Sequence, residues 1–205
     1  FWRGENAGRP AELGAAIGAF LGAMDRAVSP EGTLDPAQVS RLQACGLDQR
    51  AINNLLGLLG EQREATGVLP TDRQLVVERC RDELGDWRGM LHSPYGRRVH
   101  DPWALAIAAR IHERWQVDPS VVASEDGIMV RLPDSGGRVP GADVFLFDPE
   151  RLQRIVADAV GGSALFAARF RECASRALLL PRQAPGRRSP LWQQRLRAGQ
   201  LLDVA

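Results

Sequence analysis

Three carboxylates lie close together at Asp82, Glu83 and Asp86, next to a glycine. Paired carboxylates can hold a divalent metal ion or act as acid and base, as they do in nucleases and glycosidases. Acidic residues beside a glycine between two strands are more often a solvated turn, here with Arg81 or Arg88 near enough in sequence to form a salt bridge. The turn is the favoured interpretation, and a carboxylate-dependent nuclease or glycosylase stays open as an alternative.

The three histidines, His92, His100 and His112, do not have the spacing of a metal site. His112 is followed by a glutamate, but no second histidine completes an HExxH motif. Cys80 could be drawn with a histidine as a nucleophile and its base, although nothing in the sequence brings them together. Packed or hydrogen-bonded histidines are the favoured interpretation, so we expect no catalytic and no metal-binding residue in this chain.

All 26 basic residues are arginines, and the chain contains no lysine. A phosphate-binding loop of the GxxxxGK[ST] type needs its lysine on the nucleotide phosphates. The chain therefore cannot supply that loop. If its function involves ATP hydrolysis of the usual helicase kind, the ATPase must lie elsewhere.

The net charge is only +1, but the C-terminal third is strongly basic. Between residues 169 and 197 a single acid, Glu172, accompanies eight arginines: Arg169, Arg171, Arg176, Arg182, Arg187, Arg188, Arg195 and Arg197. Guanidinium groups match phosphate oxygens in a bidentate way and give salt-dependent, sequence-independent binding of nucleic acid. The alternative is solvated helix faces with local pairs to Glu172. We predict nucleic-acid contacts mainly from the linker residues Arg182, Arg187 and Arg188.

Trp2 is the other candidate for contact with nucleic acid, with Arg3 beside it. An aromatic ring that stacks on bases grips a single strand without reading its sequence. From local sequence alone, a tryptophan here is more often a core anchor. We expect Trp103 and Trp115 in the core, and we also favour core packing for Trp87 and Trp192.

Three cysteines far apart in the sequence, without a CxxC motif, predict reduced thiols and a cytoplasmic protein. No signal peptide is visible, and no apolar run approaches the roughly 20 residues of a membrane span. The chain begins with Phe rather than Met, so we expect it to be a fragment of a longer protein.

Apolar spacing and breaker residues predict an α+β fold. A helical N-terminal part covers residues 1–70, with helix caps at Asp35 and Asp48 and a stop at Gly67. Residues 71–205 form a small antiparallel strand-rich patch with an inserted helix, followed by a helical C-terminal part. The expected strands cover residues 74–81, 87–92, 120–123 and 128–132, with a hairpin turn at Asp126–Gly127. The expected helices begin at Asp101–Pro102, at Asp148–Pro149, at Ser163 (running to Leu180) and at Leu191.

Two stretches of the sequence resemble a known family. They are VVERCRDELGDWRGMLHSPYGRRVHDPWALAIAARI with VASEDGIMVRLP, and GSALFAARFRECASRALLLPRQAPGRRSPLWQQRLRAGQLLDVA. Both are similar to the DEAD/H-associated region of the large helicase-related (Lhr) superfamily 2 helicases, which follows the motor and winged-helix domains. The opening FWRGENAGRPAELG also fits that region, and the likeness is weakest over residues 25–70. Tyr95 stands in SPYG where phenylalanine is more usual, a change expected to be harmless.

The resemblance implies a parent enzyme that binds and hydrolyses ATP, tracks along single-stranded DNA and unwinds duplexes and DNA–RNA hybrids, with a role in DNA repair. ATP and Mg²⁺ are then expected in its motor domains and not in this fragment. The fragment is expected to line the DNA channel, to contact the motor and winged-helix domains in cis, and to stack an aromatic, for which Trp2 is the candidate, on a base. A structural docking domain without DNA contact is the second hypothesis.

Overall fold

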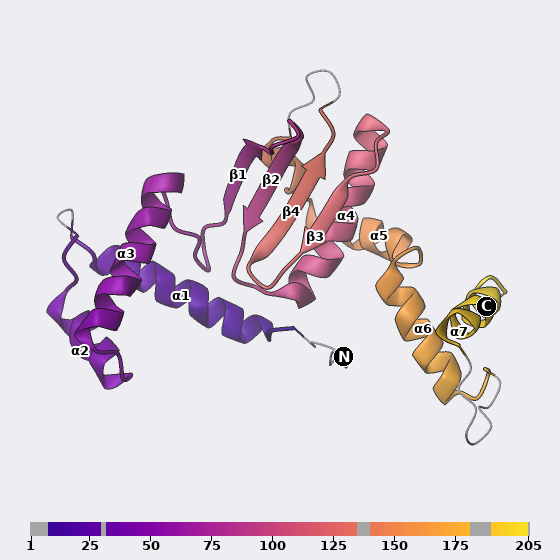
Figure 1. Cartoon of the computed structure of the whole chain (residues 1–205), viewed down its shortest axis with the longest axis horizontal. Coiled ribbons are helices and arrows are strands. Elements are labelled where there is room, and N and C mark those ends of the chain that lie inside the picture. Colours follow the sequence, from indigo (N-terminus) through magenta and orange to yellow (C-terminus); the bar gives the residue numbers. More distant parts are fainter. Residues whose placement is uncertain (1–7, 30–31, 135–139, 181–189, 205) are drawn as a thin grey trace. The chain divides into compact units, whose positions relative to one another are not determined.

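The computed structural model describes residues 8–29, 32–134, 140–180 and 190–204. Within these ranges the chain forms seven α-helices, one 3₁₀ turn and a four-stranded antiparallel sheet (Figure 1), so the α+β prediction is confirmed. None of the helices in this described part is long and apolar enough to cross a membrane. The chain divides into two compact units, Phe1–Asp148 and Pro149–Ala205. The boundary predicted at residues 70 and 71 falls inside the first unit and stays a prediction.

The first unit opens with three helices, α1 (Ala11–Ala27), α2 (Pro36–Ala44) and α3 (Gln49–Thr66). The predicted caps are confirmed, because the Asp35 carboxylate accepts the Ala37 N–H at 2.8 Å and that of Asp48 accepts the Ala51 N–H at 2.7 Å. α3 ends at Gly67, whose φ of 77° is the left-handed conformation that glycine adopts without strain. The helices share an apolar core, whose fully buried members are Met24, Leu34, Leu42, Ile52, Leu59 and Leu69.

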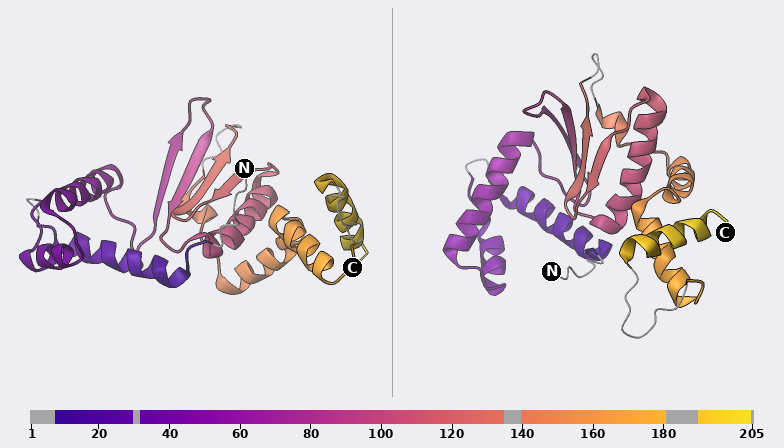
Figure 2. Two further views of the ribbon diagram at one scale, coloured as in Figure 1. Left: turned by 60° about the horizontal axis from the view of Figure 1, so that its bottom comes forward. Right: turned by 45° about the vertical axis from the view of Figure 1, so that its right-hand side comes forward.

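The sheet consists of β1 (Val76–Arg81), β2 (Trp87–His92), β4 (Gly127–Leu132) and β3 (Ser120–Ala123), in that spatial order. The two views of Figure 2 show α4 (Arg97–Trp115) along one face of it. Alternate residues of β2 and β4 meet α4 in a second apolar core, with Leu91, Ile107, Ile111 and Val130 among its buried members. Trp87, Trp103 and Trp115 pack against this core, as the sequence predicted.

α4 begins earlier than the sequence predicted. Asp101 and Pro102 were expected to cap and open the helix, but the N-cap is Gly96 and Pro102 lies inside it. Asp101 instead pairs with Arg97 one turn before it, at 3.3 Å. The added first turn carries His100, which is fully buried and hydrogen-bonded, so tertiary contacts override the start that the proline suggests.

A short segment after the sheet closes the second core. It contains the 3₁₀ turn η1 (Ala142–Val144) and the buried Phe145. The Trp103 indole donates to the Phe145 carbonyl at 2.9 Å, and the Arg110 guanidinium lies 3.5 Å from the centre of the Phe147 ring. A Cβ on Gly89 of β2 would lie 3.4 Å from the Phe145 ring, so the glycine leaves room for this packing.

The second unit consists of α5 (Pro149–Val160), α6 (Ala164–Arg176) and α7 (Leu191–Leu202). The prediction that α6 runs to Leu180 is wrong, because Leu178 adopts a left-handed conformation with φ of 60°. The Leu179 N–H then bonds the Ala174 carbonyl at 2.9 Å, which is the closing bond of a Schellman motif built without glycine. Core packing of Trp192 is also wrong, because its position on α7 leaves it 63% exposed.

The first half of α1 packs through glycine rather than through the apolar residues that its periodicity indicates. Leu13, which lies at helical spacing from the other large apolar residues of α1, is 51% exposed, while Gly14, Gly18 and Gly22 are buried. A Cβ on Gly14 would lie 2.2 Å from the Pro94 carbonyl oxygen, and one on Gly18 would lie 2.4 Å from the Asp72 nitrogen. The helix backbone therefore lies directly against two loops of the sheet region.

Gly14→Ala and Gly18→Ala should each destabilise the chain by about 1–3 kcal/mol, because the new methyl group meets main chain that must shift. Gly22→Ala is the matched control, since its methyl group would meet the flexible end of Arg26 at 3.4 Å and the Thr71 side chain at 3.6 Å, and no main chain. There alanine should be neutral or stabilise the helix by up to about 1 kcal/mol. Urea unfolding measures all three, and equal effects at the three positions would contradict this packing.

Candidate nucleic-acid interface

The five DNA-binding residues predicted from the sequence are Trp2, Arg3, Arg182, Arg187 and Arg188. All of them lie outside the described residues, so their roles stay predictions. The structure does describe what holds the chain on either side of them. Trp2 and Arg3 precede a segment that is held at Arg9. The other three arginines lie in the sequence between α6 and α7.

Arg9 clamps the start of the described chain to one end of the sheet. Its guanidinium donates to the Pro94 carbonyl at 2.8 Å and to the Glu125 carbonyl at 2.5 Å, and it forms an ion pair with Asp126 at 3.0 Å. The side chain is only 17% exposed. One arginine thus joins the N-terminal segment to the loop before α4 and to the β3–β4 turn.

Glu125 completes the clamp from the other side. Its carboxylate accepts the backbone N–H of Arg9 at 3.0 Å and that of Arg97 at 3.4 Å. The bond from Arg9 is the main cause that holds the pKa of Glu125 below its usual value, against the opposing effect of burial. The carboxylate is therefore charged at neutral pH and faces two arginines.

His100 lies beneath this clamp and joins the same loops. Its Nδ1 lies 2.7 Å from the Ser124 carbonyl oxygen, and its Nε2 lies 2.8 Å from the Ser93 hydroxyl. Because a carbonyl oxygen can only accept, Nδ1 donates its proton to Ser124, while Nε2 is paired with the Ser93 hydroxyl. Both ring nitrogens therefore make structural hydrogen bonds, in agreement with the interpretation favoured from the sequence.

The Tyr95 hydroxyl also belongs to this end of the sheet. It donates to the Asp72 carbonyl at 2.7 Å, in the loop that receives Gly18 of α1. Tyrosine in place of phenylalanine was expected to be a harmless packing change. The hydroxyl instead makes a partly buried hydrogen bond that ties the two loops beneath α1 together.

The carboxylate cluster forms the β1–β2 turn. Asp82, whose side chain is 2% exposed, accepts the Leu84 and Asp86 N–H groups at 3.0 Å. The same carboxylate forms ion pairs with Arg131 at 2.9 Å and with Arg88 at 3.4 Å. Burial acts to raise the pKa of Asp82, but these hydrogen bonds and charges outweigh it and lower the pKa. The arrangement favours the structural turn over a catalytic site.

Other candidate groups are also dispersed. Cys45, Cys80 and Cys173 are free and exposed, and His112 pairs with Asp118 at 2.9 Å on the surface. Among the residues that the structure describes, no three histidine, cysteine or acidic side chains are grouped so that they can hold a metal ion. No cysteine–histidine pair forms at His100, because both of its ring nitrogens are occupied.

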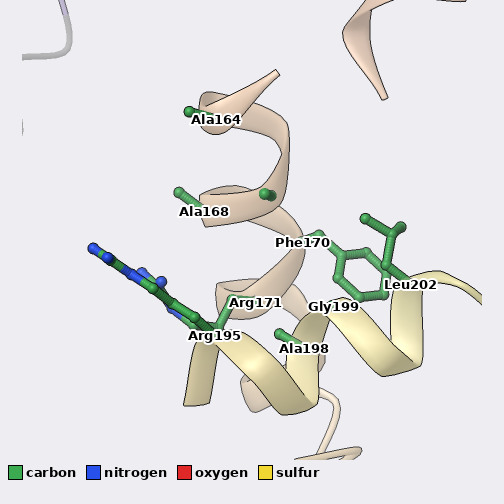
Figure 3. A pocket seen from close by; sticks show the side chains of 9 residues that line it. Ala164, Ala168, Phe170, Arg171, Arg195, Ala198, Gly199 and Leu202 are labelled. Carbon is green, nitrogen blue, oxygen red and sulfur yellow. The ribbon is translucent and has the colours of Figure 1, made fainter. Parts of the chain in front are cut away.

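Two arginines that were not among the predicted site residues converge in the second unit. Arg171 of α6 and Arg195 of α7 line a groove of about 410 Å³ between the two helices (Figure 3). The basic composition of residues 169–197 was the signal for them. Composition does not show that two arginines 24 positions apart in the sequence meet at one groove, because that depends on how α6 and α7 pack.

Residues 69–205 match the model of the DEAD/H-associated family. This chain belongs to the DEAD/H-associated family. Over its whole length it is 60% identical to the Lhr helicase/uracil glycosylase of Escherichia coli and 61% identical to the Lhr helicase of Mycolicibacterium smegmatis. It spans only 13% of the length of each of these relatives.

A solved structure also matches the whole DEAD/H-associated chain. It is that of Mycobacterium smegmatis helicase Lhr bound to single-stranded DNA and AMP-PNP, with a TM-score of 0.85 and 60% sequence identity. The match covers 100% of this chain and 25% of that one. The fold described above is therefore one that an experimentally determined helicase contains.

We expect Asp82→Asn to destabilise this DEAD/H-associated chain at neutral pH and to have little effect in acid. The folded-state pKa of Asp82 is below that of the unfolded chain, which is about 3.9. The ionised carboxylate therefore stabilises the fold above that value, and its contribution is lost as pH falls through the folded-state pKa. Urea midpoints at pH 7 and at low pH measure the difference.

Glu83→Gln is the control for this prediction. Glu83 is exposed and has no hydrogen bond or ion pair with the described residues, so its removal should change little at either pH. If the urea midpoint of Asp82→Asn stays equally far below that of the wild type in acid, the charge of Asp82 does not stabilise the turn.

Proposed function

We propose that this chain is an accessory region of an Lhr-type ATP-dependent DNA helicase that lines the path of the single strand. The observation that carries the proposal is its likeness, over its full length, to part of a helicase Lhr structure bound to single-stranded DNA and AMP-PNP. In this proposal the chain follows the motor and winged-helix domains and contacts them in cis.

ATP and Mg²⁺ belong to the motor domains in this proposal. AMP-PNP is an analogue of ATP, so its presence in the similar structure agrees with that assignment. This chain has no lysine for a phosphate-binding loop. Its contribution is mechanical, as a fixed contact against which ATP-driven closure of the motor moves the strand.

Trp2 is the proposed contact with a base of the tracking strand. Stacking tolerates any sequence, which a translocating enzyme requires of every contact that it makes and releases. The clamp at Arg9 supports this role, because it ties the chain six residues after Arg3 to a rigid end of the sheet. Arg3, Arg182, Arg187 and Arg188 would hold phosphates of single-stranded DNA or of a DNA–RNA hybrid.

A structural docking domain is the second candidate, and one observation favours it. α7 exposes three apolar side chains, those of Leu191, Trp192 and Leu196. Exposed apolar groups gathered on one helix are typical of contacts with another domain. The nuclease or glycosylase alternative has less support, because Asp82 and Asp86 are engaged by Arg88 and Arg131.

Trp2→Ala in the full-length helicase tests the proposal. Loss of a base stack costs roughly 1–3 kcal/mol, so unwinding should fall about tenfold while DNA-stimulated ATPase persists. Trp2→Phe is the matched control, since it keeps an aromatic face and should retain most unwinding. Unwinding and ATPase both at the wild-type level in a folded Trp2→Ala protein would remove Trp2 from the mechanism.

A further inference from the structure

The groove between α6 and α7 has a charged part and an apolar part. It is lined by Ala164, Ala167, Ala168, Phe170, Arg171, Arg195, Ala198, Gly199 and Leu202. Figure 3 shows the Arg171 and Arg195 side chains extending in the same direction from the two helices, and the Phe170 ring beside Leu202. Its volume of about 410 Å³ is within the roughly 300–1,000 Å³ of ligand pockets.

Neither arginine of the groove has an acidic partner in the described part of the chain. Arg171 and Arg195 make no hydrogen bond or ion pair with those residues, whereas the neighbouring Arg169 is paired with Glu172 at 3.1 Å. α6 and α7 together carry five arginines and one carboxylate, that of Glu172, which is already engaged. Two unneutralised guanidinium groups at one groove indicate an anionic ligand.

The other residues that line the groove indicate which class of anion fits it. Ala168, Ala198 and Gly199 have small side chains, which leave space where the two helices meet. Phe170 offers an apolar wall and lies 6.4 Å, between ring centres, from Phe166. Single-stranded nucleic acid combines phosphates with flat apolar bases, so it matches both parts of the groove.

We infer that the α6–α7 groove binds the backbone of single-stranded DNA, with Arg171 and Arg195 on its phosphates and Phe170 beside its sugars and bases. This inference rests on the proposed function, because it gives the same strand a second contact in a separate unit of the chain. The contact is independent of sequence.

The test measures binding of a labelled oligothymidine to the full-length protein, without ATP, at several salt concentrations. Arg171→Gln with Arg195→Gln should weaken binding about tenfold and lower the magnitude of the salt slope by about 1.4, from two single-strand phosphate contacts. Arg176→Gln with Arg197→Gln removes the same charge from exposed positions on the same helices that do not line the groove. This control pair should bind as the wild type does.

A second pair keeps the test decisive if the glutamine variant folds poorly. Arg171→Lys with Arg195→Lys retains the charge but loses the bidentate fork, so affinity should fall severalfold while the salt slope stays unchanged. Equal weakening by the groove pair and the control pair would overturn the inference in favour of a diffuse field. Unchanged DNA affinity, with lower thermal stability of the groove variant, would also overturn it and indicate an acidic segment of the same protein as the occupant.

The inference and the proposed function fail in different ways. Trp2→Ala is judged by the ratio of unwinding to ATPase, and the groove by equilibrium affinity and its salt slope. Normal coupling in Trp2→Ala together with a reduced salt slope in the groove variant would support DNA binding in the groove and contradict the role of Trp2. Uncoupling in Trp2→Ala with an unchanged slope in the groove variant would do the reverse.

Discussion

The hydrogen bonds of the buried His100 are the interaction on which the arrangement of one end of the sheet depends. One ring nitrogen holds the end of β3 through Ser124, and the other holds the end of β2 through Ser93. The Ser93 N–H also bonds the Asp126 carbonyl at 3.1 Å, so the two loops are joined directly as well. A buried ring satisfied at both nitrogens leaves little freedom for either loop, because any shift would strand a polar group away from water.

Arg9 and α1 both contact the two loops that His100 joins at this end of the sheet. Gly127, at the start of β4, packs tightly against β2, since a Cβ there would lie 1.9 Å from the Leu91 carbonyl oxygen. Arg9 finds carbonyl groups of both loops within reach of one guanidinium, and α1 lies against Pro94 through Gly14. A polar pair of loops, rather than the apolar core alone, therefore determines where the N-terminal segment is attached. A fixed attachment at Arg9 is also what the proposed stacking of Trp2 requires.

Local signals in the sequence predicted much of this fold. The caps at Asp35 and Asp48, the stop at Gly67 and the Asp126–Gly127 turn all depend on backbone chemistry within a few residues, so they can be recognised without knowing the fold. The start of α4 and the end of α6 could not be predicted in that way. The first depends on contacts of His100 with distant serines, and the second on a leucine in a conformation usually taken by glycine.

Candidate site residues were harder to predict for the same reason. Hydrophobic periodicity assigns the contact face of α1 to large side chains and misses Gly14 and Gly18. These two glycines allow close contact because they have no side chain. The basic composition of the C-terminal third was apparent, but composition does not say which arginines meet. Arg171 and Arg195 share a groove only because α6 and α7 pack in one register.

The free cysteines have a practical consequence for the study of motion. Cys80 stands exposed on β1 in the first unit, and Cys173 stands exposed on α6 in the second. Thiol-directed probes can therefore be attached to both units without engineering new sites in this part of the protein. With the exposed Cys45 replaced, spectroscopic distances between probes on Cys80 and Cys173 would report how the two units move relative to each other.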